Sequence, residues 1–101
     1  MNTPETPEIH AENSGLDVNY YLCPVANPNQ ARDPYTAECG DIIEALNMTF
    51  NEATAFKSIW RKASQRTLGL HKLNNDAVRD AEKMVFYSRR ELSVMTGKKV
   101  F

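Results

Sequence analysis

Residues 49 to 69 carry the start and stop signals of one long helix. Thr49 is followed three residues later by Glu52, and this spacing predicts a capping box in which each side chain accepts from the other residue's backbone N–H. Gly69 is typical of the left-handed residue that ends a helix, so we expect the helix to run to about Leu68. The apolar residues that recur at helical spacing, and that we expect to be buried, are Ala53, Phe56, Ile59, Trp60 and Ala63.

A second long helix is predicted before Gly97. Asn74 or Asn75 can cap its start, and the helical pattern continues to about Met95. The expected inward-facing residues are Val78, Ala81, Val85, Ser88, Leu92 and Met95. Further apolar residues, Met84, Phe86 and Tyr87, widen the apolar surface beyond what a small subunit can bury. We therefore expect a homo-oligomer, a dimer or a larger even-numbered assembly, in contact through Met84, Val85, Phe86 or Leu92.

A shorter helix is expected before these two, over residues 34–46. Asp33 is a good N-cap, and Pro34 suits the first helical position because its missing N–H costs nothing there. The residues that would share one face of this helix are Tyr35, Cys39, Ile42 and Leu46. Gly40 weakens it by about 1 kcal/mol relative to alanine, so we expect the helix to depend on tertiary packing.

The N-terminal third of the chain is predicted to be irregular. Residues 1–15 are too polar to offset their ordering entropy by burial and are expected to form a disordered tail. Residues 16–33 are expected to form an extended arm with at most one short strand, since prolines interrupt its β-prone run. The expected fold is all-α: a hairpin of two long helices and the shorter helix within a helical domain, residues 34–96, ending in residues 97–101.

The overall charge hides an asymmetry between the two halves. Residues 1–52 hold nine acids and one base, whereas residues 53–101 hold four acids and eleven bases, which gives −8 and +7 and a net charge of −1. The basic half contains side chains suited to phosphate and to base or ribose contacts, one helical turn apart: Lys57, Arg61, Lys83, Tyr87 and Arg90.

These five residues form the predicted ligand-binding site, and its expected ligand is a small anionic, nucleotide-like molecule. A chain that is not basic overall makes long nucleic acid a less favoured partner. Two alternatives stay open. The basic row is either a solvated flank neutralised by Asp80, Glu82 and the acidic first helix, or a surface that binds a protein.

Enzymatic chemistry finds little support in the residues. Glu38, Asp41 and Glu44 resemble the metal-binding carboxylates of all-α nucleoside triphosphate pyrophosphatases, but the second set would have to be Asp76 and Asp80. Arg79 and Lys83 would compete with a cation for those two acids. His10 and His71 have no recognisable nucleophilic partner, and the chain has no phosphate-binding P-loop. We therefore predict no catalytic residue, metal or cofactor, with a pyrophosphatase-like enzyme as the alternative.

The compartment is inferred from what the sequence does not contain. It has no signal peptide and no apolar run of membrane-spanning length, so we expect a soluble cytoplasmic protein without membrane contact. Cys23 and Cys39 have no spaced Cys or His partners of a zinc site, and a reduced, buried thiol is expected for Cys39.

Two strings carry a family resemblance. "ECGDIIEALNMTFNEATAFKSIWRKA", followed after a spacer by "DAVRDAEKMVFYSRREL", resembles the SaV-like family of small phage and prophage proteins of unknown function, over about half the chain. The matching positions are Asp41, Ile42, Glu44, Ala45, Leu46, Ala55, Lys57, Ile59, Trp60, Arg61, Asp80, Lys83, Tyr87 and Arg90. The family's usual glycine is replaced near Ala53 or Thr54, and the N-terminal tail has no counterpart. The resemblance implies a non-enzymatic accessory protein in the host cell cytoplasm that acts by binding a nucleotide-like anion or a host protein, in host takeover or counter-defence.

Overall fold

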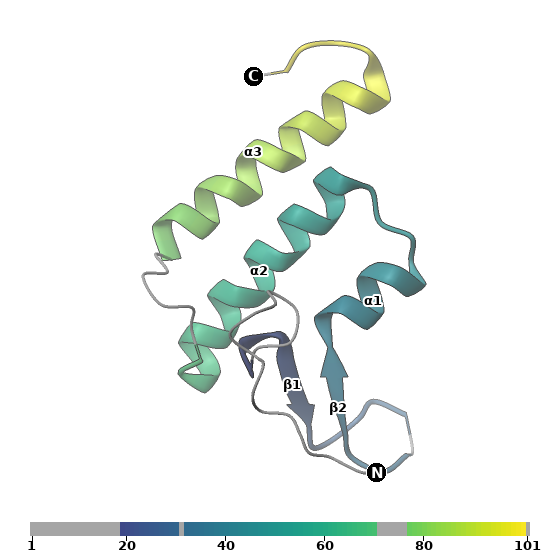
Figure 1. Ribbon diagram of the computed structural model, residues 1–101, viewed down its shortest axis with the longest axis vertical. Helices are drawn as coiled ribbons and strands as arrows, with labels where there is room; N and C mark the ends of the chain where they lie inside the picture. The colour runs from purple at the N-terminus through teal and green to yellow at the C-terminus, as the bar shows by residue number, and fades with distance from the viewer. Residues whose placement is uncertain (1–18, 31, 71–76, 101) are drawn as a thin grey trace.

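The chain folds into two long helices beside a small hairpin of strands (Figure 1). The computed structural model describes residues 19–30, 32–70 and 77–100. Its elements are a 3₁₀ turn η2 (Asn19–Tyr21), strands β1 (Leu22–Val25) and β2 (Tyr35–Glu38), and helices α1 (Cys39–Ala45), α2 (Phe50–Leu68) and α3 (Ala77–Thr96). The fold is broadly helical, as expected, but the sheet means that it is not purely all-α. The tail at residues 1–15 and the caps proposed at Asn74 and Asn75 lie outside the described residues.

Helices α2 and α3 form an antiparallel hairpin. Near the start of α2, the Thr49 hydroxyl donates to Glu91 Oε1 over 3.0 Å, and Glu91 lies near the end of α3. Further along α2, Arg61 is paired with Asp80 in the first turn of α3. The Phe50 and Tyr87 rings meet edge to face between these points, with centroids 5.9 Å apart. The hairpin of two long helices is therefore confirmed. No described helix combines the length and the apolar character needed to cross a membrane.

The predicted bounds of α2 are confirmed at both ends. The Thr49 hydroxyl accepts from the Glu52 N–H over 3.1 Å, and Glu52 Oε1 accepts from the Thr49 N–H over 2.9 Å. Gly69 ends the helix in the left-handed region at φ 72°. At the end of α3, Gly97 adopts the same φ, also 72°. Local capping interactions therefore account for three of the four helix ends in the hairpin, which are the start and end of α2 and the end of α3.

The capping box gives a first test of these contacts. Thr49→Ala should lower the free energy of unfolding by about 0.5–2 kcal/mol, the usual cost of losing an N-cap side chain. The added loss of the bond to Glu91 places the result toward the upper end of this range. Chemical denaturation at fixed protein concentration measures the change. Thr49→Ser, which keeps the hydroxyl, should stay close to the wild type, and equal losses in both variants would contradict the capping role.

The helix predicted from residue 34 was wrong at its start. Residues 35–38 form β2, which pairs antiparallel with β1 so that Leu22 faces Glu38 and Val25 faces Tyr35. Helix α1 begins only at Cys39. The capping signal at Asp33 does not start a helix, because Tyr35 and Thr36 favour strand conformation and pair with β1 in the preceding arm. Pro24 is tolerated within β1 because a two-stranded sheet leaves each strand an open edge.

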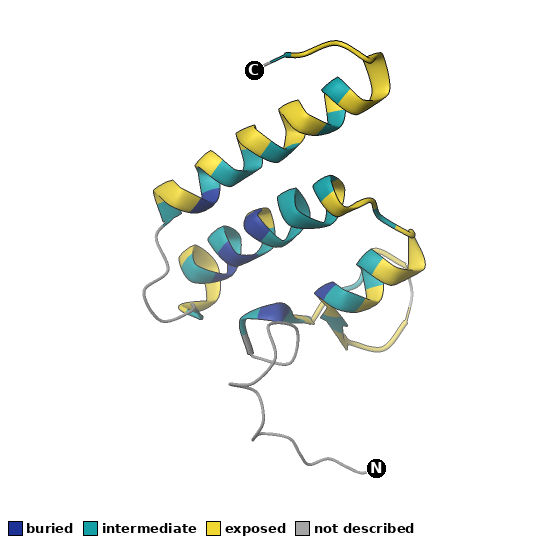
Figure 2. Cartoon of the chain, turned by 45° about the horizontal axis from the view of Figure 1, so that its top comes forward, coloured by how far each residue is buried: buried dark blue, intermediate teal, exposed yellow. Residues whose placement is uncertain are grey.

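The buried core is small and mainly polar (Figure 2). Its described members are Tyr21, Cys39, Ser58, Arg61, Ser64 and Asp80. The expected apolar face of α3 was therefore wrong, since Val85 is 50% exposed and most of the other expected residues are also exposed. The expected face of α2 is only partly enclosed: Ile59 is 48% exposed, while the other four residues are half-buried. Helix α3 instead reaches α2 through Asp80, Tyr87 and Glu91, which lie on a face turned away from the predicted one.

Candidate functional site

Arg61 is at the centre of a buried polar network. Its Nη2 and Nε atoms donate to Asp80 Oδ1 over 3.0 Å and 3.3 Å, so one carboxylate oxygen accepts from two nitrogens of the same guanidinium. The remaining Nη1 atom donates to the Tyr21 hydroxyl over 2.6 Å, and Nη2 also donates to Ser58 Oγ over 3.3 Å. Arg61 is 7% exposed and Asp80 1% exposed. The network joins η2, α2 and α3.

The electrostatics of the network follow from this enclosure. Burial alone would lower the pKa of Arg61, but hydrogen bonds to Asp80 and Tyr21 outweigh it and raise the pKa above its ordinary value. Burial also raises the pKa of Tyr21, and the bond from Arg61 opposes this rise only in part. Arg61 therefore stays charged and Tyr21 stays protonated, so that the guanidinium donates both to a carboxylate and to a neutral hydroxyl.

Arg61 thus has a structural role within the subunit. The sequence interpretation placed it on a surface that meets a ligand, whereas the structure buries it against Asp80. Its pairing with Asp80 agrees with the alternative in which acids neutralise the basic row, although the pair is buried rather than solvated. Tyr21 was not considered as a partner, because nothing in a single sequence indicates which residue of an extended arm will reach a helix forty positions away.

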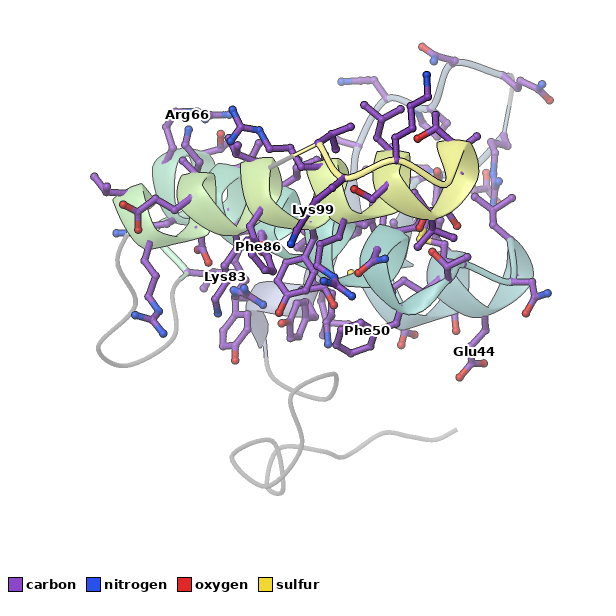
Figure 3. The ribbon with its side chains drawn as sticks, turned by 90° about the horizontal axis from the view of Figure 1, so that it is seen from above. Glu44, Phe50, Arg66, Lys83, Phe86 and Lys99 are labelled. Carbon is purple, nitrogen blue, oxygen red and sulfur yellow. The ribbon has the colours of Figure 1, made fainter. Side chains whose placement is uncertain are left out.

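Two of the other predicted ligand residues come together. Lys83 and Tyr87 line a shallow hollow of about 270 Å³ on α3. The remaining residues that line it are Arg79, Glu82 and Phe86. The Phe86 and Tyr87 rings are in edge-to-face contact, with centroids 5.0 Å apart. Figure 3 shows Lys83 and Phe86 on one side of the helix pair and Arg66 on the other.

The last two predicted ligand residues do not line this hollow. Lys57 is half-buried on α2, and its charge is close enough to Cys39 to oppose in part the rise that burial causes in the pKa of that thiol. Arg90 is exposed one turn beyond Phe86 on α3. Arg79, which sequence reasoning treated only as a competitor for cations, is the cationic residue that it missed. Arg79 comes four residues before Lys83 and seven before Phe86, and this helical spacing could have placed it on the same face of the helix.

The acids considered for a metal site are dispersed. Glu38, Asp41 and Glu44 are exposed around α1, while Asp80 accepts from Arg61. Asp76, His10 and His71 lie outside the described residues. Within residues 19–30, 32–70 and 77–100, no three His, Cys, Asp or Glu side chains gather in a way that could hold a metal ion.

Cys39 is the most enclosed ionisable group on α1. It is fully buried, and this burial raises the pKa of its thiol to about 11, although the nearby charges of Lys57 and Arg61 act in the opposite direction. Cys23 on β1 is half-buried and, like Cys39, is not in a disulfide. The buried, reduced thiol expected at Cys39 is confirmed, and it is held in its neutral form.

A larger groove of about 490 Å³ lies between the start of α2 and the second half of α3. Its lining residues are mainly apolar or aromatic: Leu46, Met48, Asn51, Glu52, Ala55, Phe56, Ile59, Tyr87, Ser88 and Glu91. Trp60, on another side of α2, packs against Phe56 with ring centroids 5.8 Å apart. Its indole nitrogen is buried and has no hydrogen-bond partner among the residues that the structure describes. The hairpin therefore presents both a cationic, aromatic hollow and an apolar groove.

Comparison of the chain with family models, with curated proteins and with solved structures finds no match. Inference about function therefore depends on these surfaces.

Proposed function

We propose that the protein acts by binding rather than by catalysis, and that its ligand is a small, phosphate-bearing aromatic anion of the nucleotide type. The hollow on α3 supports this proposal, because it gathers the cations Arg79 and Lys83 beside the rings of Phe86 and Tyr87. Guanidinium and ammonium groups form charge-assisted hydrogen bonds with phosphate oxygens, and an aromatic face stacks on a base.

The charge of the hollow favours a small ligand. Glu82 also lines it, so the two cations are partly offset, and the chain as a whole has a net charge of −1. A surface of this kind does not offer the extended positive stripe that long nucleic acids require. The resemblance to the SaV-like family extends the proposal to a phage or prophage accessory protein in the host cell cytoplasm, active in host takeover or counter-defence.

Titration with ATP by isothermal calorimetry tests the binding proposal. We expect saturable binding that Arg79→Ala weakens roughly tenfold or more, because a hydrogen bond between charged groups contributes about 1.5–3 kcal/mol. Arg66→Ala is the matched control, since Arg66 is an exposed cation on the other side of the helix pair. Inorganic phosphate and adenosine, titrated separately, distinguish phosphate recognition from stacking.

Three outcomes would overturn this proposal. Equal weakening in the Arg79 and Arg66 variants would show that only general charge attracts the nucleotide. Release of pyrophosphate or phosphate from ATP in the presence of Mg²⁺, lost in Glu38→Gln or Asp41→Asn, would establish the pyrophosphatase-like alternative instead. A host protein as ligand is the other alternative, and absence of any ATP binding would favour it.

A further inference from the structure

Helix α3 carries a seven-residue apolar repeat on a face that does not point at α2. Val78, Val85 and Leu92 are spaced seven apart, and Ala81, Ser88 and Met95 each follow one of them by three residues. This is the spacing of the first and fourth positions of a heptad, which line the contact between paired helices. We call these six residues the α3 seam.

The α3 seam is largely exposed within one subunit. Val78 is 65% exposed, Val85 50%, Leu92 48% and Met95 75%. By contrast, Asp80, Tyr87 and Glu91 lie on the face that contacts α2 and the residue that caps it. Figure 2 shows exposed residues along most of the length of α3. A helix-long apolar row of this kind marks an interaction surface.

The seam is continuous with the apolar groove on α2. Ser88 belongs to the seam and also lines the 490 Å³ groove, together with Ala55 and Ile59 of α2. Ile59 is 48% exposed, and Leu46 at the near end of the groove is 67% exposed. A helix lying along the seam would therefore also cover part of this groove, so both helices of the hairpin would contribute to one interface.

We propose that a second copy of this chain binds on the α3 seam, with the two α3 helices antiparallel and related by a two-fold axis. In this arrangement Val78 faces the second copy's Met95, Ala81 faces its Leu92, and Val85 faces its Ser88. The two hairpins then form a four-helix bundle, in which α2 of each subunit supports its own α3. This proposal is independent of the ligand proposed for the hollow.

Charge complementarity identifies the occupant as a second copy. Glu82 and Arg89 are exposed and flank the seam on the side away from α2. Glu82 follows Val78 by four residues, and Arg89 follows Val85 by four residues. In the antiparallel arrangement Glu82 meets the second copy's Arg89, and Arg89 meets the second copy's Glu82. One chain thus supplies both halves of two opposite-charge pairs, as a two-fold interface requires.

The same charges disfavour the neighbouring arrangements. Shifting one α3 by seven residues in one direction places Glu82 opposite Glu82 of the second copy. Shifting it in the other direction places Arg89 opposite Arg89 of the second copy, so like charges meet in both cases. Parallel helices would place Glu82 beside Ala77 and Arg89 beside Met84 of the second copy, with no opposite-charge pair. Flanking charges set the orientation and register of paired helices in this way, while the apolar seam supplies most of the affinity.

Sedimentation analysis of the full chain tests the seam. We expect the wild type to be dimeric at tens of micromolar and Val85→Glu to be monomeric at the same concentration, with unchanged helicity by circular dichroism. Val94→Glu is the matched control, because Val94 is 67% exposed on α3 but lies outside the seam. A monomeric wild type, or equal dissociation in the two variants, would overturn the proposal.

Charge exchange tests the antiparallel register. Arg89→Glu alone should raise the dimer dissociation constant roughly tenfold, because both flanking pairs become pairs of acids. Glu82→Arg alone should have a similar effect, and the double exchange should restore the wild-type constant. Dimerisation that depends on Val85 but is not restored by the double exchange would overturn the antiparallel arrangement. These measurements of mass do not involve a ligand, so their failure is distinct from failure of the proposed nucleotide binding.

Discussion

Asp80→Ala is expected to lower the free energy of unfolding by about 3–5 kcal/mol, because it leaves the buried Arg61 guanidinium without its counter-charge. Two hydrogen bonds to Asp80 Oδ1 are lost, and the remaining contacts of Arg61 are to the hydroxyls of Tyr21 and Ser58. A neutral hydroxyl does not replace the carboxylate charge in a site closed to water. A loss of this size is a large part of the roughly 5–15 kcal/mol by which folded domains are stable, so the variant should unfold at a much lower denaturant concentration than the wild type.

Chemical denaturation followed by circular dichroism measures this loss at fixed protein concentration, since association would otherwise change the apparent stability. Glu44→Ala is the control, because Glu44 is an exposed acid on α1 and its removal should change stability by no more than about 0.5 kcal/mol. Replacing both partners, as Arg61→Met with Asp80→Leu, should recover much of the loss, because no buried charge is then left unpaired. An Asp80→Ala variant as stable as the control would show that the network does not hold the hairpin together.

The buried pair also explains how much of the fold the sequence could predict. Helix ends depend on contacts a few residues apart, and the signals at Thr49 and Gly69 were therefore read correctly. The strand at residues 35–38 depends on pairing with residues 22–25, which no local signal at Asp33 reports. The capping signal alone favoured a helix from residue 34, but pairing with β1 made residues 35–38 a strand.

The candidate site was harder to predict because periodicity does not say which face of a helix turns inward. Helix α3 has a regular apolar row at Val78, Val85 and Leu92, and this row was expected to be the core face. The subunit instead buries Asp80 against Arg61 and leaves the row exposed. Apolar spacing shows that a row of side chains shares one face of a helix, but only tertiary contacts decide whether that face is buried within the subunit.

Stability is also expected to fall as the pH rises from about 9 to about 11, because Cys39 holds its proton more tightly in the folded chain. Burial raises the pKa of the Cys39 thiol from its ordinary value of 9.0 to about 11. Below pH 9 the thiol is protonated in both the folded and the unfolded chain, so its contribution to stability is fully present. Between these two values the unfolded chain loses the proton while the folded chain keeps it, and unfolding becomes more favourable by up to roughly 2–3 kcal/mol.

Denaturation curves at pH 8 to 11 measure this effect, and Cys39→Ala isolates it. The variant should lose some stability at every pH because it leaves a small cavity beside α1, but its stability should decline less steeply between pH 9 and pH 10. Cys23→Ala should keep the wild-type decline, since Cys23 is on β1 and only half-buried. Burial also raises the pKa of Tyr21 above its ordinary value of 10.0. Tyr21 therefore adds a further decline in stability above pH 10, and this decline should be present in both cysteine variants. Identical profiles for the wild type and Cys39→Ala below pH 10 would show that the pKa of the thiol is not raised in the folded chain, which would contradict the burial of Cys39 at the start of α1.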